Sequence, residues 1–493
     1  MEKKLFEKVI LGFILVAVII SLYNRYFVIF SYSPDTGGME YELIYEIQRI
    51  LAGLPLYPDP AHLPYHLTQK TPLYHFMVAG VAYLFQIDAT DVYKIYLTSR
   101  IVTFSIILLV VTLSYRIGKR IFNFNTIESV IYCLSIELIL GHSHHYYSRM
   151  DVLYCFFFLL LFYYLNQFKW EIDLKKCFIY SGLSVLLFFT KQQGLAIIPF
   201  VGFSLLLNKQ SPILVINYGI ISILLIGGIP LFLGQDLKLL YKNVIVGINN
   251  GIDFTFLNYY WTSEFQLLFN LFTLFSAVMV FIKNRQSSEI KIFNLLLFLL
   301  LFFILGLVTS LKYGAGNNYF TEYKILALTT FMIFLKTSPL SLFKSLFGLS
   351  FFMLISVMGI KDEDILSLRK NRITDLDNYQ NELLATEYLL DRESTNKVPS
   401  ILVFRKPSML NNLLFPHVIL PTKATFRATF NKSKNPAKAS VHNSFDNNIL
   451  NYIILSKRDP QNLIFMDYPL NGYTLEKTFG EIKIYTKKIP STQ

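Results

Sequence analysis

Apolar residues dominate the chain from residue 8 to residue 360, in long runs that short polar loops separate. A helix needs about 20 predominantly apolar residues to cross a lipid bilayer, with a range of about 17 to 25. The pattern therefore predicts an all-α polytopic membrane domain, residues 1–360, with about eleven transmembrane helices, some near or below that lower limit. The predicted spans are 8–28, 95–116, 122–141, 151–167, 177–190, 194–207, 212–233, 265–282, 291–310, 319–335 and 343–360.

Basic residues recur in alternate loops, and this recurrence predicts the orientation of the spans. Lys and Arg are enriched in cytoplasmic loops, so we place Lys3, Lys4 and Lys8 in the cytoplasm. The alternation then predicts that 72–87 does not cross and that 177–207 forms two helices, because the other choices would place basic loops outside. The later cytoplasmic loops carry Arg116, Lys119 and Arg120; Lys169, Lys175 and Lys176; Lys209; Lys283, Arg285 and Lys291; Lys336 and Lys344.

The external loop 31–94 is predicted to contain two helices that do not cross the membrane. Within 40–54 the apolar residues recur with a helical period opposite Glu42, Glu46 and Arg49, which is typical of a helix lying on the membrane surface. Pro72 opens a second apolar stretch, 72–87, which we interpret as an interfacial or re-entrant helix.

The apolar pattern ends after Gly359, and residues 361–493 are predicted to form a small α/β domain. The odd number of spans places this tail outside the cytoplasm. Runs rich in β-branched and aromatic residues predict strands at 400–404 and 452–455 and a terminal pair, 473–479 and 481–485, hinged on Gly480. The length of the tail lies in the lower part of the usual range for domains.

Composition and charge exclude several classes of protein. Of the 493 residues 53% are hydrophobic and 16% are charged, and the apolar residues are clustered in blocks, as in a membrane protein. The net charge is +12, but much of the Lys and Arg lies in short loops between spans, where the enrichment of basic residues in cytoplasmic loops explains it. Membrane lipids are therefore favoured as partners, and nucleic acid is not. Cys133, Cys155 and Cys177 lie in or beside apolar blocks, which argues against a disulfide or metal framework. The amino-terminal run lacks a cleavage site and is interpreted as a retained anchor.

Polar residues that could carry chemistry gather in the predicted outer loops. A transporter or lipid flippase would instead have ionisable residues near the middle of several spans or broken helices in two related halves, and no internal repeat is visible. Carboxylates and amines at the outer ends of spans favour an enzyme that acts on a lipid-borne group. Loop by loop, the candidates are Asp35, Glu40, Glu42 and Lys70; Arg149 and Asp151; Lys191; Lys312, Asn318 and Tyr319.

On these residues the chain resembles the integral-membrane glycosyltransferases of the GT-C fold. It is similar to the group of protein O-mannosyltransferases and lipid A aminoarabinose transferases, which use polyprenyl-phosphate sugars. The chain has Thr36 where an acidic pair is common in the mannosyltransferases. The matching features, all within 1–335, are Asp35, the loop and helix of 40–53, Lys70 before Pro72, Arg149-Met150-Asp151, Thr190-Lys191-Gln192 and Asn318-Tyr319.

The resemblance implies that Asp35 is the general base, and the chemistry requires a residue of that type. Inverting transfer from a sugar phosphate needs a base that takes the proton of the acceptor hydroxyl. Fixed cations must stabilise the departing phosphodiester, and no metal or other cofactor is needed if Lys and Arg supply them. The candidate cations are Lys70, Arg149, Lys191 and Lys312; the other candidates for substrate contact are Glu40, Glu42, Asp151, Asn318 and Tyr319.

The acidic candidates also have structural interpretations. Asp35 could cap the surface helix. Glu40 and Glu42 suit the first turn of a helix, where the dipole favours negative charge. Asp151, at the mouth of a span, could pair with Arg149 or Lys191 without any contact to substrate.

The basic candidates and the histidines have simple alternatives too. Lys70 and Lys312 could extend their amines to the membrane interface. His142, His144 and His145 are not spaced as a helical i, i+4 pair, and no acidic ligand is fixed nearby in sequence, so a metal site is not favoured.

The sequence as a whole predicts a glycosyltransferase of the bacterial inner membrane, with its amino terminus in the cytoplasm. It would move a hexose or pentose from a polyprenyl-phosphate donor to a hydroxyl group of a lipid, glycan or protein. The alternatives are a transporter or flippase and, within the enzyme class, a ligase or polymerase of surface polysaccharide.

Overall fold

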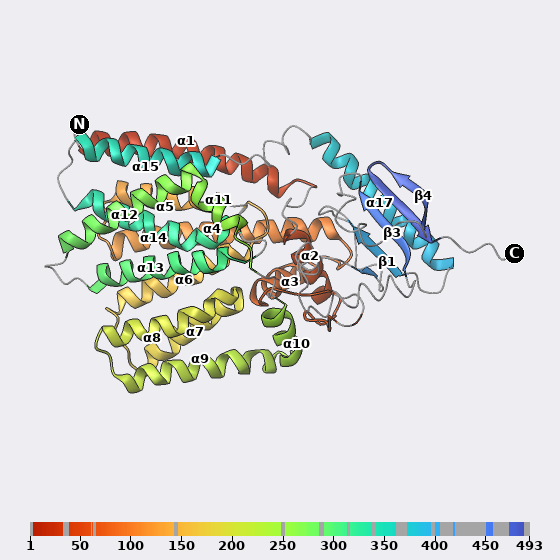
Figure 1. Ribbon diagram of the computed structural model, residues 1–493, viewed down its shortest axis with the longest axis horizontal. Helices are drawn as coiled ribbons and strands as arrows, with labels where there is room; N and C mark the ends of the chain where they lie inside the picture. Colours follow the sequence, from red (N-terminus) through yellow and green to blue (C-terminus); the bar gives the residue numbers. More distant parts are fainter. Residues whose placement is uncertain are drawn as a thin grey trace. The chain divides into compact units, whose positions relative to one another are not determined.

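A computed structural model describes the elements in Figure 1. The described residues are 3–32, 39–60, 62, 66–141, 146–247, 252–284, 290–312, 316–337, 342–360, 372–395, 400–404, 418–419, 450–456 and 473–487. Asp35 and the histidines at 142, 144 and 145 lie outside them. The helices are α1 (Lys3–Ile29), α2 (Met39–Leu51), α3 (Leu73–Leu84), α4 (Val92–Arg120), α5 (Thr126–Gly141), α6 (Met150–Gln167), α7 (Leu174–Thr190), η1 (Gln192–Ala196), α8 (Ile197–Leu207), α9 (Pro212–Phe232), α10 (Leu237–Tyr241), η2 (Lys242–Val246), α11 (Thr255–Thr262), α12 (Glu264–Asn284), α13 (Ile290–Ser310), η3 (Asn317–Phe320), α14 (Thr321–Lys336), α15 (Leu342–Ile360) and α17 (Arg372–Thr395). The strands are β1 (Ser400–Phe404), β2 (Val418–Ile419), β3 (Leu450–Ser456), β4 (Tyr473–Phe479) and β5 (Ile482–Lys487).

The chain divides into two compact units. Unit 1 comprises Met1–Tyr26, Ile101–Leu233 and Ile252–Glu363, and unit 2 comprises Phe27–Arg100, Gly234–Gly251 and Asp364–Gln493. Unit 2 therefore combines the predicted external loop with the predicted soluble tail. The domain boundary that the sequence predicts at residue 361 stays a prediction.

Six helices within the described residues are long and apolar enough to cross a membrane, so the chain is a multi-pass membrane protein. They are α1, α4, α6, α9, α12 and α13, and each matches a predicted span. The remaining predicted spans form α5, α7, α8, α14 and α15, which do not meet the same criteria of length and composition. The total of about eleven crossings therefore stays a prediction.

Local backbone chemistry explains why some helices are shorter than predicted. A capping box begins α5: the Asn125 backbone N–H donates to Glu128 Oε2, and the Glu128 N–H donates to Asn125 Oδ1, each at 2.8 Å. The helix therefore begins at Thr126 and not at residue 122.

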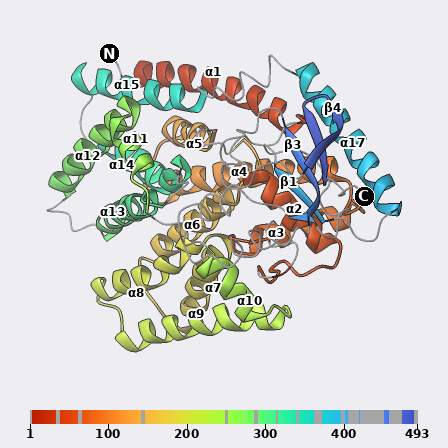
Figure 2. The ribbon, with the colours of Figure 1, turned by 45° about the vertical axis from the view of Figure 1, so that its right-hand side comes forward.

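The predicted break within 177–207 is confirmed. Lys191 ends α7 with an extended backbone, and a 3-10 turn, η1, separates α7 from α8. Gly194 lets this turn fold back on α7, because a Cβ atom at this position would collide with the backbone of Leu187 and Phe188. Helices α7, α8 and α9 lie side by side in both views (Figure 1, Figure 2). The break fixes Lys191 at the end of α7.

The described strands of the tail form one sheet in the order β2-β1-β3-β5-β4. Strand β1 is parallel to β2 and β3, and β5 is antiparallel to β3 and β4. Gly480 has a φ of +54° in the β4–β5 turn, which confirms the predicted hinge. The strands predicted at 400–404, 452–455, 473–479 and 481–485 are confirmed within a few residues, so the tail is α/β.

Helix α17 covers one face of this sheet (Figure 1). Ala385 and Leu389 of α17 pack with Ile454 and Ile484 of the sheet in a buried apolar cluster, which Tyr45 of α2 also joins. The predicted surface helix, α2, therefore contributes to the same core as the tail.

Candidate functional site

A buried ion pair lies at the junction of α6 and α7 in unit 1. Lys191 Nζ is 2.7 Å from Asp151 Oδ1, and only 6% and 1% of the two residues are exposed. Asn318 Nδ2, from η3, donates to the same carboxylate oxygen at 3.0 Å. The fold thus joins three predicted site residues from distant parts of the chain.

Aromatic rings surround the ammonium group of Lys191. Its Nζ atom lies 4.7 Å from the centroid of the Tyr319 ring and 5.9 Å from that of Tyr154, within the range of cation–π attraction. Burial by itself lowers the pKa of Lys191, but Asp151 and Glu322 raise it above the ordinary value of lysine. Lys191 is therefore a permanent, fixed cation that is suited to stabilising an anion.

Glu322 is a further buried acid of this cluster. It lies in the first turn of α14, 1% exposed, and its Oε1 atom accepts a hydrogen bond from Cys155 Sγ at 3.2 Å. The sequence interpretation assigned no role to Glu322, Tyr154 or Cys155. The sequence signal that could have identified Glu322 is an acidic residue at the mouth of a predicted span.

Arg149 and Lys312 also belong to unit 1. Arg149 is the extended N-cap residue of α6, two residues before Asp151, and it is 6% exposed. Lys312 follows α13 and forms an isolated β-bridge with Ile252. Unit 1 thus gathers Asp151, Lys191, Asn318 and Tyr319 directly and places Arg149 at the start of the same helix as Asp151.

Arg100 and Glu40 form a second buried ion pair, in unit 2. Arg100 Nε donates to Glu40 Oε1 and Nη2 to Glu40 Oε2, both at 2.8 Å, and neither side chain is exposed. Arg100 Nη1 donates to the backbone oxygens of Val28 at 2.7 Å and Ser31 at 2.8 Å. Arg100 therefore binds residues on both sides of segment 33–38, which contains Asp35 and lies outside the described residues.

Both carboxylate oxygens of Glu40 are held by Arg100 in the structure. The predicted contact of Glu40 with substrate stays a prediction. Sequence reasoning missed Arg100. The signal that could have found it is an arginine inside the predicted span 95–116, since ionisable residues within apolar helices usually have a buried partner or a function.

Lys70 and Glu42, two predicted site residues, pair with each other in unit 2. Lys70 Nζ lies 3.5 Å from Glu42 Oε2, and both side chains are almost buried. Glu46, one turn further along α2, was not predicted to have a role. The fold therefore places Lys70 beside the surface helix, on its charged face.

Glu46 joins two buried histidines beside Lys70. Its carboxylate lies 2.6 Å from His75 Nε2 and 3.2 Å from His66 Nε2. Burial alone raises the pKa of Glu46, but Lys70, His66 and His75 together lower it below its ordinary value. His75 Nδ1 lies 3.1 Å from the backbone oxygen of Thr71, so both ring nitrogens of His75 face hydrogen-bond acceptors. The contact between Glu46 of α2 and His75 of α3 fixes the two helices against each other.

The described part of the chain contains no group of three or more His, Cys, Asp and Glu residues that could hold a metal ion. The predicted histidine loop lies outside that part, so its interpretation stays a prediction. The two buried clusters instead offer fixed charges, which can stabilise an anion.

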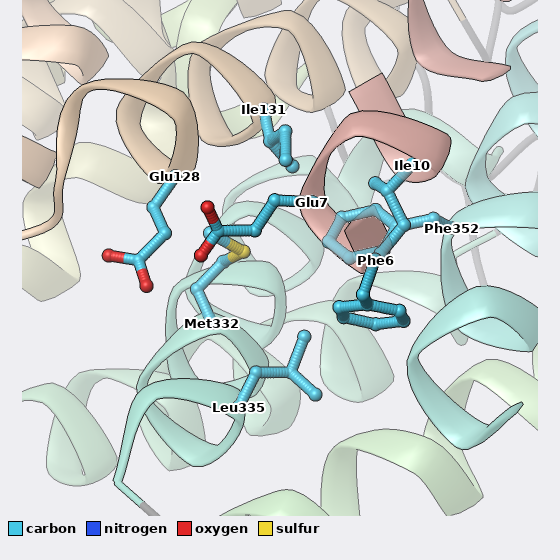
Figure 3. A pocket seen from close by; sticks show the side chains of 8 residues that line it. All are labelled: Phe6, Glu7, Ile10, Glu128, Ile131, Met332, Leu335 and Phe352. Carbon is cyan, nitrogen blue, oxygen red and sulfur yellow. The ribbon is translucent and has the colours of Figure 1, made fainter. Parts of the chain in front are cut away.

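A small cavity lies at the opposite end of α14 (Figure 3). Glu7 and Glu128 line it together with six apolar side chains, and Asn125 contacts both carboxylates. Its volume of about 30 Å³ accommodates about one or two water molecules. Met332 of the cavity is ten residues from Glu322, or about 15 Å along the helix axis, so the cavity is separate from the candidate site.

Breaking the Asp151–Lys191 pair from one side is expected to be costly. Lys191→Met leaves a buried carboxylate without its cation and should reduce the free energy of unfolding by about 3–5 kcal/mol. The double variant Asp151→Leu/Lys191→Met should recover most of that loss, because two apolar side chains replace two charges. Thermal unfolding and activity are measured on the same preparations.

The double variant separates a structural role from a functional one. If the pair has a function, the double variant is stable and inactive. A double variant that regains activity along with stability would reduce the pair to a structural contact.

Comparisons with known proteins reveal the fold. No family model and no curated protein matches the sequence. Among solved structures, ArnT from Cupriavidus metallidurans bound to undecaprenyl phosphate matches 97% of this chain and 98% of its own, with 12% identity and a TM-score of 0.56. The archaeal oligosaccharyltransferase AglB from Archaeoglobus fulgidus, in complex with an inhibitory peptide and a dolichol-phosphate, matches 98% of this chain and 75% of its own, with 11% identity and a TM-score of 0.53. The predicted GT-C fold is confirmed.

Proposed function

We propose that the chain is a glycosyltransferase that moves a sugar from a polyprenyl-phosphate donor to a hydroxyl group of a lipid, glycan or protein. The main support is the structural match to ArnT, which was solved bound to undecaprenyl phosphate. The match covers almost the whole of this chain and almost the whole of the ArnT chain. A second structure of the same fold is in complex with a dolichol-phosphate. Both ligands are polyprenyl phosphates, which would be the leaving group of such a donor.

In the proposed reaction Asp35 is the general base. It takes the proton of the acceptor hydroxyl, and the acceptor oxygen forms a bond to the anomeric carbon of the sugar. The bond between that carbon and the phosphate oxygen breaks, and the electron pair leaves with the polyprenyl phosphate. Attack opposite the leaving group inverts the anomeric configuration.

Fixed cations stabilise the negative charge on the departing phosphate in this proposal. Lys191 is the best supported, because it is buried, charged and held by Asp151. Arg149, Lys70 and Lys312 are further candidates. Asn318 and Tyr319 line the same cluster as Lys191 and would complete the contacts to the donor. Glu42 orients Lys70 through their ion pair.

We also propose the location of the enzyme, on the outer face of a bacterial inner membrane. The alternation of basic and polar loops supports about eleven crossings with a cytoplasmic amino terminus. In that arrangement the soluble tail and the loop with Asp35 are both outside the cytoplasm.

Reconstitution of the purified chain with a radiolabelled polyprenyl-phosphate sugar tests the proposed function. We expect the label to move to a lipid, glycan or protein acceptor and an equal amount of polyprenyl phosphate to appear. Mass spectrometry of surface glycans and lipids in a deletion strain should then show one missing residue mass, which identifies the sugar. Movement of intact labelled lipid across the vesicle membrane without cleavage would instead support the flippase alternative.

A further inference from the structure

Lys70 of unit 2 lies in a stretch of backbone that buried side chains hold in place. The Lys70 backbone oxygen accepts a hydrogen bond from the Tyr57 hydroxyl at 3.1 Å. The next backbone oxygen, of Thr71, lies 3.1 Å from His75 Nδ1. Only 2% of Tyr57 is exposed, and none of His75 is. Two buried rings therefore hold the consecutive carbonyl groups of Lys70 and Thr71.

Further hydrogen bonds join the residues before Lys70 to a preceding loop. The Thr68 backbone N–H donates to Asn243 Oδ1 and the Thr68 hydroxyl to the Leu56 backbone oxygen, both at 2.9 Å. Asn243, from η2, also donates to the Pro58 backbone oxygen at 2.9 Å. Thr68 and Asn243 are both fully buried. The backbone that leads to Lys70 is thus fixed at several points.

Two acids of α2 act on the Lys70 side chain. Glu42 Oε2 lies 3.5 Å from Lys70 Nζ. Burial by itself raises the pKa of Glu46, and the charge of Lys70 is the largest of the influences that lower this pKa. The Glu46 carboxylate also contacts His75 Nε2 at 2.6 Å. The His75 ring therefore joins a carboxylate that attracts Lys70 to the backbone beside Lys70.

We propose that His75 is a positioning residue: its ring contacts Glu46 and Thr71 at once and thereby fixes the place of the Lys70 amine. This inference rests on the proposed function, in which Lys70 is one of the cations that stabilise the departing polyprenyl phosphate. A cation stabilises developing charge most when it is already fixed where that charge appears. His75 acts on the donor phosphate only through Lys70.

Two conservative variants of full-length protein separate the two contacts of the His75 ring. The side-chain amide of asparagine can replace Nδ1, and that of glutamine can replace Nε2. His75→Leu loses both contacts and should weaken the binding of undecaprenyl phosphate about tenfold, within the range of couplings in one hydrogen-bond network. His75→Asn and His75→Gln each keep one contact and should lose less affinity.

A double-mutant cycle with Lys70 distinguishes positioning from a general effect on the fold. Lys70→Met removes the cation, so His75→Leu should cause little further loss of undecaprenyl-phosphate affinity in that background. A purely structural role of His75 gives the same loss of affinity with and without Lys70. Equilibrium binding to the two single variants, the double variant and the unaltered chain completes the cycle.

Tyr57→Phe keeps the test decisive if the His75 variants fold poorly. It removes one hydroxyl group and releases the Lys70 oxygen, while the contact between Glu46 and His75 remains. This variant should also weaken undecaprenyl-phosphate binding, and the loss should again disappear in the Lys70→Met background. His62→Asn is the matched control and should bind normally, because the His62 side chain is 80% exposed.

The outcomes separate this inference from the proposed function. Normal affinity in both His75→Leu and Tyr57→Phe, or losses that persist undiminished in Lys70→Met, would overturn the positioning role. If the unaltered chain binds no undecaprenyl phosphate or transfers no sugar, the proposed function fails. Hydrogen exchange at the amides of 67–71 then still decides whether His75 holds the backbone at Lys70: His75→Leu should speed this exchange, and unchanged exchange would contradict the inference.

Discussion

Asp35→Asn should abolish sugar transfer and leave expression and polyprenyl-phosphate binding largely intact. Asparagine has nearly the same size as aspartate, but its amide cannot take up the proton of the acceptor hydroxyl group at neutral pH. Loss of a general base typically costs a factor of about 10² to 10⁴ in rate. Initial rates with saturating donor, together with equilibrium binding of polyprenyl phosphate, measure the two properties separately.

The matched control for this variant is Asp88→Asn. Asp88 is an exposed residue of the same external region, and its Oδ1 atom accepts hydrogen bonds from the backbone and hydroxyl of Thr90, which asparagine can also satisfy. The Asp88→Asn variant should transfer sugar at the normal rate. Near-normal turnover in Asp35→Asn would show that another group removes the proton.

Variants of Arg100 and Glu40 should have a large effect on stability and a second large effect on activity. Glu40→Gln removes the negative partner of a fully buried guanidinium, and loss of one member of such a pair costs about 3–5 kcal/mol of unfolding free energy. Arg100→Lys keeps the charge but cannot reproduce the forked contact with both carboxylate oxygens. Both variants should also lower kcat, because Arg100 binds Ser31 and Glu40, which flank the segment that contains the proposed base Asp35.

An exposed ion pair of similar length is the control. Asp91 and Lys94 are separated by 2.7 Å, but the lysine side chain is 62% exposed. Asp91→Asn should change stability by at most about 1 kcal/mol. Denaturation followed by fluorescence measures all three variants. An Arg100→Lys protein as stable and as active as the original would show that the buried pair does not hold the loop.

Sequence patterns predicted the local features of the fold well. Apolar runs located the six long helices, and a helical period located α2. The alternation of basic loops predicted the break at Lys191, which the structure confirms. Residue composition predicted the strands of the tail. Apolar runs, the helical period and strand composition depend on residues that are close together in the sequence, and the alternation of basic loops depends on their order along the chain. None of these signals needs knowledge of distant contacts.

The candidate site was predicted only in part, because its residues come from distant parts of the sequence and only the fold brings them together. Asp151, Lys191, Asn318 and Tyr319 were recognised by residue type and predicted side of the membrane, and the fold brings these four together. Glu322 escaped notice because a single acid at a helix start has an ordinary explanation in the helix dipole.

The sequence by itself determined that the chain is a membrane protein with an α/β tail, because bilayer thickness and strand periodicity act on local runs of residues. Tertiary structure alone decided which charges are partners. Glu40 and Arg100 are 60 residues apart, and Asp151 and Lys191 are 40 residues apart. Such pairs are selected by the packing of distant helices, and burial makes their mutual contact necessary, since a lone charge in a low-dielectric interior is costly.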